Sequence, residues 1–155
     1  MQDVLIIGTG MAATALASTL AGKARVTLVE KSRGFGGRMA TRRREGFEFD
    51  HGAQFFTARS TEFKQFLAQP VERDAIQEWQ PRLTTLEAGR EPYKREWFEP
   101  HFVAKPSMNS LCKESLKALE NHVDIILGCE VGSIEKIDIG NASCRWRVFS
   151  KQLDS

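Results

Sequence analysis

The sequence has few of the residues from which metal and thiol sites are built. It contains only three cysteines and three histidines in 155 residues. The cysteines are widely spaced, odd in number and without a Cys-x-x-Cys pair, which favours reduced thiols in a reducing compartment over a zinc or disulfide framework; they are Cys112, Cys129 and Cys144. No Ser/His/Asp or paired-carboxylate arrangement stands out, so we assign no metal ligand and no catalytic residue.

The chain also lacks a long apolar run and a large excess of charge. No apolar stretch approaches the length that crosses a bilayer. The N-terminus carries Asp3 and no Lys or Arg, and two glycines interrupt it, unlike a signal peptide. The net charge of +2 is far from that of a DNA- or RNA-binding domain. We therefore expect a cytoplasmic protein with no nucleic-acid or membrane partner.

One local cluster of charge, Arg42-Arg43-Arg44, stands apart from this balance. It fits a solvated turn between strands. A second interpretation is a patch that attracts an anionic dinucleotide substrate.

The N-terminal segment has the pattern of a phosphate-binding turn that follows a strand. Residues 4–7 read Val-Leu-Ile-Ile, which predicts a parallel strand buried on both faces. Gly8 permits a tight turn, and Gly10 lets backbone amides approach a pyrophosphate. Ala13 takes the third small position, where a helix must lie close to the sheet.

A helix is expected directly after this turn. Residues 11–21 are rich in Ala and Leu, and Gly22 follows as a helix-ending residue. The free N–H groups at its start, which include those of Met11 and Ala12, would point at the diphosphate.

A second strand, residues 26–29, ends at Glu30, about 20 residues beyond the glycines. A carboxylate there accepts hydrogen bonds from a ribose 2′-hydroxyl and repels a 2′-phosphate. Taken singly, the glycines also fit an ordinary loop and Glu30 a solvated strand end. The order strand, turn, helix, strand and acid favours a dinucleotide site.

Two later blocks extend the pattern. Gly36 and Gly37 allow close backbone approach, and Arg38 offers a planar fork of donors suited to phosphate or ring-carbonyl oxygens. Alone, these three residues would also fit a flexible loop. Residues 46–50 alternate apolar and polar side chains as a half-buried strand does.

The segment Glu30-Lys31-Ser32-Arg33-Gly34-Phe35-Gly36-Gly37-Arg38-Met39-Ala40-Thr41 resembles the extended FAD signature of the flavin-containing amine oxidase superfamily. Residues 50–57, DHGAQFFT, resemble more narrowly the segment that follows in renalase and its bacterial renalase-like relatives, and residues 102–111 resemble it more loosely.

The resemblance implies FAD as the cofactor and a role for each matching residue. Gly8, Gly10 and the amide of Ala12 would hold the diphosphate, and Glu30 the adenosine ribose. Arg38 would lie beside the diphosphate and reach toward the flavin. The flavin end would contact two later residues, Gln54 and Phe55.

The expected fold class is α/β: a Rossmann-type FAD-binding fold, a parallel sheet with helices, followed by the start of a β-rich substrate domain. Residues 1–60 would form the FAD-binding βαβ unit with flavin-side strands, 61–106 a partial substrate layer, and 107–155 a helix, strand and hairpin that return to the FAD domain. By resemblance the chain would be the N-terminal half of such a protein: a natural truncation, a frameshifted product or a fragment. Its uncovered sheet edges would then favour self-association.

Local patterns predict the later elements. Residues 62–68 have helical apolar spacing closed by Pro70, and Ser107 is expected to cap a helix that runs to about residue 119. Residues 71–100 would begin the substrate layer as strands over the flavin. Residues 123–127 read as a buried strand and 134–149 as a hairpin with its turn near Gly140-Asn141.

Three functions are compatible with these patterns. The leading one is a renalase-like FAD-dependent oxidoreductase, which by resemblance would take hydride from a dihydronicotinamide or amine-type small molecule and pass electrons to oxygen. Its partner would be a small-molecule substrate, with a nicotinamide dinucleotide among the candidates. The second is a NAD-dependent Rossmann dehydrogenase. The third is a non-catalytic dinucleotide-binding remnant.

Overall fold

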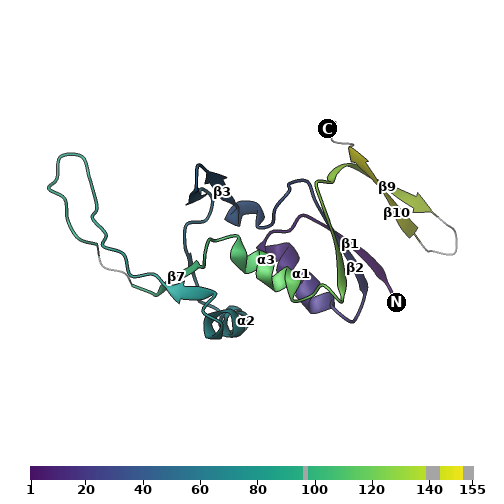
Figure 1. The fold of residues 1–155 in the computed structure, drawn as a ribbon, viewed down its shortest axis with the longest axis horizontal. Helices are drawn as coiled ribbons and strands as arrows, with labels where there is room; N and C mark the ends of the chain where they lie inside the picture. The colour runs from purple at the N-terminus through teal and green to yellow at the C-terminus, as the bar shows by residue number, and fades with distance from the viewer. Residues whose placement is uncertain (96–97, 139–143, 152–155) are drawn as a thin grey trace.

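A computed structural model describes residues 1–95, 98–138 and 144–151 of the chain (Figure 1). The helices and strands of this described part are, in chain order, β1 (Asp3–Ile7), α1 (Met11–Leu20), β2 (Arg25–Glu30), the 3₁₀ helix η1 (Gly37–Met39), β3 (Thr41–Arg44), β4 (Phe47–Asp50), β5 (Phe56–Thr57), α2 (Thr61–Glu72), β6 (Ile76–Glu78), β7 (His101–Ala104), α3 (Ser110–Lys117), β8 (Val123–Leu127), β9 (Glu130–Asp138) and β10 (Cys144–Lys151).

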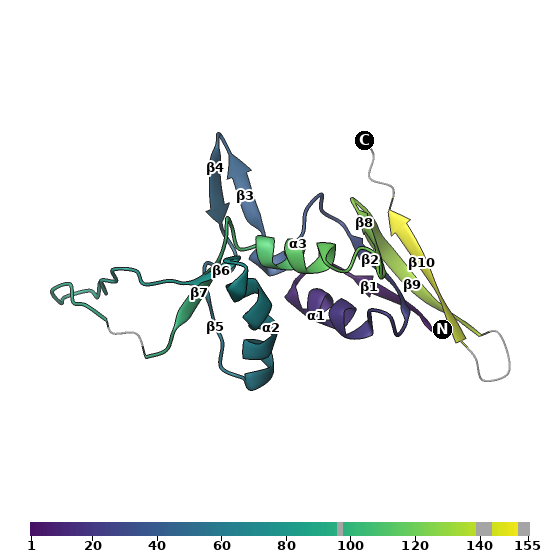
Figure 2. The same ribbon diagram turned by 60° about the horizontal axis from the view of Figure 1, so that its bottom comes forward.

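The expected α/β fold is confirmed by a parallel sheet in the order β1-β2-β8. Helices α1 and α3 cover one side of this sheet, and the β9–β10 hairpin lies on the other (Figures 1 and 2). The core between sheet and helices is built from Ile6, Ala17, Val26, Leu28 and Leu116. Ala17 is fully buried, and its small side chain lets α1 approach the strands closely, as a βαβ unit requires.

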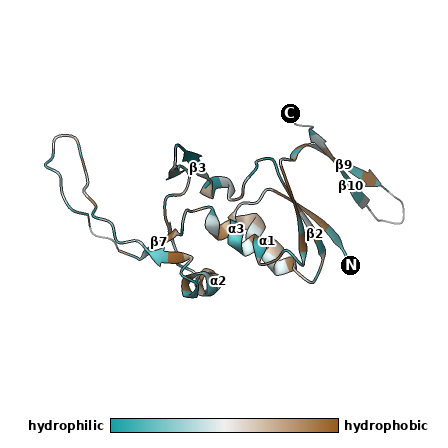
Figure 3. Cartoon of the chain, viewed as in Figure 1, coloured by the Kyte–Doolittle hydropathy of each residue, from teal (hydrophilic) through white to brown (hydrophobic). Residues whose placement is uncertain are grey.

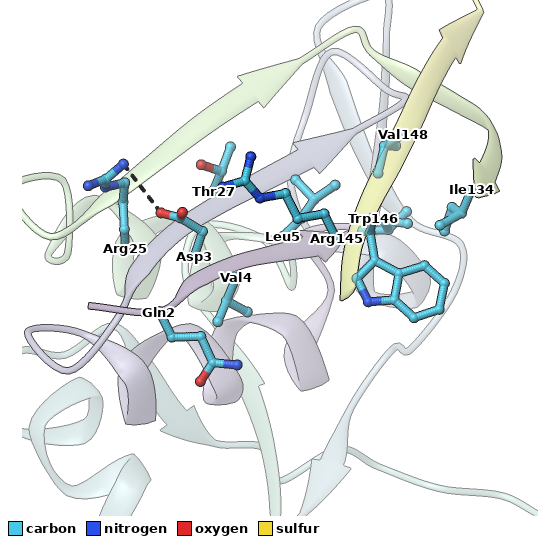
Figure 4. A pocket seen from close by; sticks show the side chains of 11 residues that line it. Gln2, Asp3, Val4, Leu5, Arg25, Thr27, Ile134, Arg145, Trp146 and Val148 are labelled. Carbon is cyan, nitrogen blue, oxygen red and sulfur yellow. Dashed lines mark ion pairs between the residues drawn. The ribbon is translucent and has the colours of Figure 1, made fainter. Parts of the chain in front are cut away.

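The second face of the sheet is less covered than predicted. Side chains alternate along a strand, so Leu5 and Ile7 of β1 point away from the helices, and they are 40% and 52% exposed. A cavity of about 930 Å³ lies between this face and the hairpin, where Trp146 of β10 forms one wall (Figure 4). Burial of β1 on both faces was therefore a wrong prediction, because a two-stranded hairpin covers only part of that face.

A smaller antiparallel sheet, β5-β7-β6, packs with α2 around a separate core. This core contains Leu67, Ile76, Ala104, Met108 and Leu111. In Figure 3 the strands of the parallel sheet are mostly brown, whereas the described part of the long loop between β6 and β7 is mostly teal. This described part of the loop extends away from both cores (Figures 1 and 2).

Helix α2 runs past the proline that was expected to end it. Ser60 caps its N-terminus, because the Ser60 Oγ accepts a hydrogen bond from the Phe63 N–H at 3.1 Å. The helix continues through Pro70 to Glu72. A proline removes one backbone donor, and so near the end of a helix it interrupts the bonding of a single turn only.

Helix α3 begins later than predicted. It spans Ser110–Lys117, and Asn109, not Ser107, occupies the N-cap position without a side-chain cap hydrogen bond. The Ser107 hydroxyl instead donates to the Asn109 Oδ1 at 2.9 Å. The cap prediction was wrong: the Ser107 oxygen accepts a hydrogen bond from Arg43 at 3.3 Å, and Arg43 is 64 positions away in the sequence.

The segment 71–100 is less regular than the predicted strands over the flavin. Among its described residues the strand β6 and one isolated bridge, Thr85 to Tyr93, are the regular pairings. The predicted C-terminal hairpin is confirmed by antiparallel pairing of β9 with β10. Its expected turn, Gly140-Asn141, lies outside the described residues.

Candidate dinucleotide-binding site

The turn between β1 and α1 has the geometry that its glycines predict. Gly8 has a φ of +101°, a backbone conformation that glycine adopts without strain. Gly10 is the N-cap of α1, and the first helical bond runs from the Thr14 N–H to the Gly10 carbonyl at 2.9 Å. The N–H groups of Met11, Ala12 and Ala13 therefore have no partner within the helix and carry its positive dipole end.

These N–H groups border a cavity of about 760 Å³. Five glycines and three alanines are among its twelve lining residues, so a ligand can approach the backbone closely. The lining is Ile7, Gly8, Gly10, Met11, Ala12, Ala13, Gly36, Gly37, Arg38, Met39, Gly52 and Ala53. Arg38 supplies a positive charge at the wall, and its side chain is exposed. Free amides, a helix N-terminus and an arginine together suit a phosphate-bearing ligand.

The second glycine pair packs directly on the first turn. The Gly36 N–H donates to the Thr9 carbonyl at 3.1 Å, and Gly10 pairs with Gly36 as a parallel bridge. A Cβ on Gly36 would lie 2.9 Å from the Cβ of Asn109, and Gly36 also has a φ of +116°. Glycine is required there both by backbone conformation and by the close packing of α3's N-cap residue.

A further contributor, Gly52, was missed by the sequence analysis. A Cβ at this position would stand 2.0 Å from the carbonyl oxygen of Arg38. The next residue, Ala53, donates its N–H to that same carbonyl at 2.9 Å. Gly52 lies in the same block as Gln54 and Phe55. Glycine is needed there because of contact with Arg38, which is 14 residues earlier in the chain.

The predicted flavin-side residues Gln54 and Phe55 are not among the lining residues of this cavity. Phe55 is 39% exposed and contacts the rings of Trp79 and His101, at centroid distances of 5.5 and 4.7 Å. The structure thus brings nine of the eleven predicted cofactor residues around the glycine turn, namely the eight in the lining and Glu30 behind it, and leaves these two just beyond.

Glu30 is buried, with 7% of its surface exposed, and its carboxylate points back to the glycine turn. The Glu30 Oε2 accepts hydrogen bonds from the N–H and the hydroxyl of Thr9, both at 3.0 Å. The Oε1 accepts from the N–H and the hydroxyl of Ser32, at 2.9 and 2.5 Å. Burial alone would raise the pKa of Glu30, but the hydrogen bonds from Ser32 and then Thr9 outweigh it and lower that pKa. The carboxylate is therefore held charged.

A polar cluster ties the β3–β4 hairpin to the start of α3. The Asp50 Oδ1 accepts from the Thr41 hydroxyl at 2.6 Å and from the Met108 N–H at 3.1 Å. Arg43 reaches the Ser107 hydroxyl at 3.3 Å. These hydrogen bonds join residues that are 58 and 68 positions apart in the sequence. They hold β3 in place, and β3 directly follows the segment that carries Arg38.

Metal ligands, thiols and membrane-spanning helices are other features that could give the described residues a function. No group of His, Cys, Asp and Glu side chains suited to a metal ion occurs among the residues that the structure describes. Burial raises the pKa of the Cys112 thiol, although a hydrogen bond with Thr14 opposes that effect. Across residues 1–95, 98–138 and 144–151, no helix has the length and apolar character needed to cross a membrane.

Comparison with known families agrees with this geometry. The family model described as an NAD(P)-binding Rossmann-like domain matches residues 6–70. The match covers the end of β1, the glycine turn, α1, β2, the second glycine pair and Gly52. The site therefore lies within the segment that is similar to a Rossmann-like domain.

Solved structures share the fold at low sequence identity. An oxidoreductase from Methanosarcina mazei is 13% identical, with a TM-score of 0.66; the match covers 99% of this chain and 58% of that one. A protein from Exiguobacterium sp. 255-15, named as a candidate protoporphyrinogen oxidase, is 12% identical, with a TM-score of 0.68 and coverage of 96% and 56%. A Pseudomonas aeruginosa protein named as a candidate FAD-dependent monooxygenase is 19% identical, with a TM-score of 0.50 and coverage of 88% and 35%. The chain thus spans little more than half the length of the first two of these proteins.

Proposed function

We propose that this chain binds FAD at the glycine-lined cavity and forms the cofactor-binding part of a renalase-like FAD-dependent oxidoreductase. The observation that carries the proposal is the joining of two glycine segments, Gly8–Ala13 and Gly36–Arg38, at the N-terminus of α1. A generic Rossmann site needs only the first of these segments. The second brings an arginine to the same cavity and continues from the Glu30 segment that resembles the FAD signature.

The residues of the glycine-lined cavity and Glu30 would each bind a different part of FAD. The free N–H groups of Met11, Ala12 and Ala13 would bind the diphosphate, and Arg38 would neutralise its charge. Glu30 would orient the adenosine ribose.

The flavin half would extend toward Gln54 and Phe55, beyond the cavity lining. When bound, the flavin ring would supply a hydride acceptor for a dihydronicotinamide or amine-type substrate, with oxygen as the final acceptor. The chain would supply position and charge.

A second candidate is a NAD-dependent dehydrogenase, which the description of the matching family favours. Glu30 is compatible with it, because the same carboxylate recognises the ribose of NAD. The Gly36-Gly37-Arg38 wall would then have no defined ligand role.

The visible spectrum of the purified chain, recorded after incubation with FAD and desalting, tests the proposal. A flavin absorbance band, with free flavin released on denaturation, is the expected result. Colourless protein whose melting temperature rises with NAD would overturn it in favour of the dehydrogenase. Bound FAD that no dihydronicotinamide or amine reduces under anaerobic conditions would contradict the oxidoreductase part and leave a binding protein.

A further inference from the structure

The carboxylate of Glu30 already has a protein donor at each of its acceptor positions. A carboxylate offers about four lone-pair sites. Thr9 fills two of them on Oε2 and Ser32 fills two on Oε1. An adenosine ribose hydroxyl can therefore bond to Glu30 only by replacing one of these four donors.

Two of the donors cannot be replaced without moving the backbone, because they are the N–H groups of Thr9 and Ser32. The two hydroxyls can rotate, but their surroundings differ. Thr9 is completely buried. Ser32 is exposed, and its Oγ also lies 3.1 Å from the Gly34 carbonyl oxygen. The Ser32 hydroxyl has one proton, and it can be donated either to Glu30 or to Gly34.

We propose that Ser32 is a positioning residue for adenosine: its hydroxyl holds the place of a ribose hydroxyl on Glu30 Oε1 and turns to the Gly34 carbonyl when the ribose binds. This inference rests on the proposed dinucleotide function. The ribose hydroxyl donates to Oε1 and Ser32 donates to Gly34, so the number of hydrogen bonds is unchanged. Ser32 nevertheless exchanges a hydrogen bond to a charged carboxylate for a weaker one to a neutral carbonyl. Glu30 keeps its donors and its charge throughout, and a 2′-phosphate, which brings negative charge instead of a donor, is rejected.

The experiment measures the affinities of ADP and 2′,3′-dideoxy-ADP by calorimetry for the unchanged chain, Ser32→Ala and Ser32→Thr. The preference for ADP over the dideoxy analogue should rise about three- to tenfold in Ser32→Ala, because the ribose no longer has to displace the stronger hydrogen bond from Ser32 to the carboxylate. Ser32→Thr retains a hydroxyl and should keep the original preference. Ser32→Cys, with its weak S–H donor, is a second variant and should fall between.

If Ser32 serves only to orient Glu30, a different change in the preference for ADP is expected. In that case the preference for ADP will fall or stay unchanged in Ser32→Ala, and the placeholder role is overturned while ADP still binds. If the unchanged chain binds neither ADP nor FAD, the proposed function itself fails, and the inference fails with it.

Discussion

At the residue scale, Glu30 contributes both to the candidate site and to stability. Its pKa is lowered in the folded protein by the Ser32 and Thr9 hydrogen bonds. A lowered carboxylate pKa contributes stability above the unfolded pKa of about 4, and this contribution is lost as the pH falls through the folded pKa.

We expect Glu30→Gln to lower the free energy of unfolding at pH 7 by about 1–3 kcal/mol, because the amide group of Gln places a donor against the donors of Thr9 or Ser32. The same variant should lose less stability than the unchanged chain between pH 6 and pH 3. Urea unfolding at both pH values measures the difference. Equal acid sensitivity of the two proteins would show that Glu30 does not carry this titration.

Unlike Glu30, Arg38 has a role in the candidate site that can be separated from folding. Its side chain is exposed, so Arg38→Ala should leave the melting temperature almost unchanged. It should weaken FAD binding roughly tenfold, by loss of a charge-assisted hydrogen bond to phosphate. Arg42→Ala removes an equal charge from the neighbouring strand β3 and is the matched control. Full FAD occupancy in the Arg38 variant would refute its role at the diphosphate.

At the scale of elements, the loop that carries Arg38 is held by contacts with distant segments. Gly52→Ala would place a Cβ against the Arg38 carbonyl, and the backbone must shift to relieve the contact. We expect a loss of about 1–3 kcal/mol in the free energy of unfolding together with weaker FAD binding. Gly34→Ala is the control, because a Cβ there has open space and no positive φ. Equal stability of both variants would contradict the proposed close approach.

The elements that the sequence predicted well are those whose patterns are local. Strands β1, β2 and β8 and helix α1 were predicted to within one residue at each end, because β-branched runs and an Ala-rich segment specify them directly. The start of α3 was not, because the Ser107 hydroxyl accepts a hydrogen bond from Arg43, 64 positions away in the sequence, instead of capping the helix. A hydrogen-bond partner so distant in the sequence cannot be identified from local patterns.

At the scale of the whole molecule, the parallel sheet has one well-packed face and one partly open face. Leu5 and Ile7 on the sheet and Trp146 on the hairpin expose large apolar surfaces around the cavity of Figure 4. Apolar surface of this kind favours association. The edges of the sheet add unpaired backbone groups.

We therefore expect the purified chain to self-associate with increasing concentration. Trp146→Gln, at a side chain that is 62% exposed, should shift the weight-average mass measured by light scattering toward the monomer. Phe47→Gln, which removes a similarly exposed aromatic from the distant β3–β4 hairpin, is the control and should leave the mass unchanged. An identical concentration dependence for all three proteins would exclude the hairpin face as the contact.

The amino-acid sequence by itself determined the strand, glycine turn, helix and acid of the βαβ unit, since each depends on the conformational preferences of neighbouring residues. It also placed Gly8, Gly10, Glu30 and the Gly36–Arg38 block in one candidate site. Only the tertiary structure decided that Gly52 meets the Arg38 carbonyl and that Ser32 and Thr9 fill the acceptors of Glu30. The reason is physical: backbone preference acts between adjacent residues, whereas close approach and hydrogen-bond competition depend on which distant segments the fold packs together.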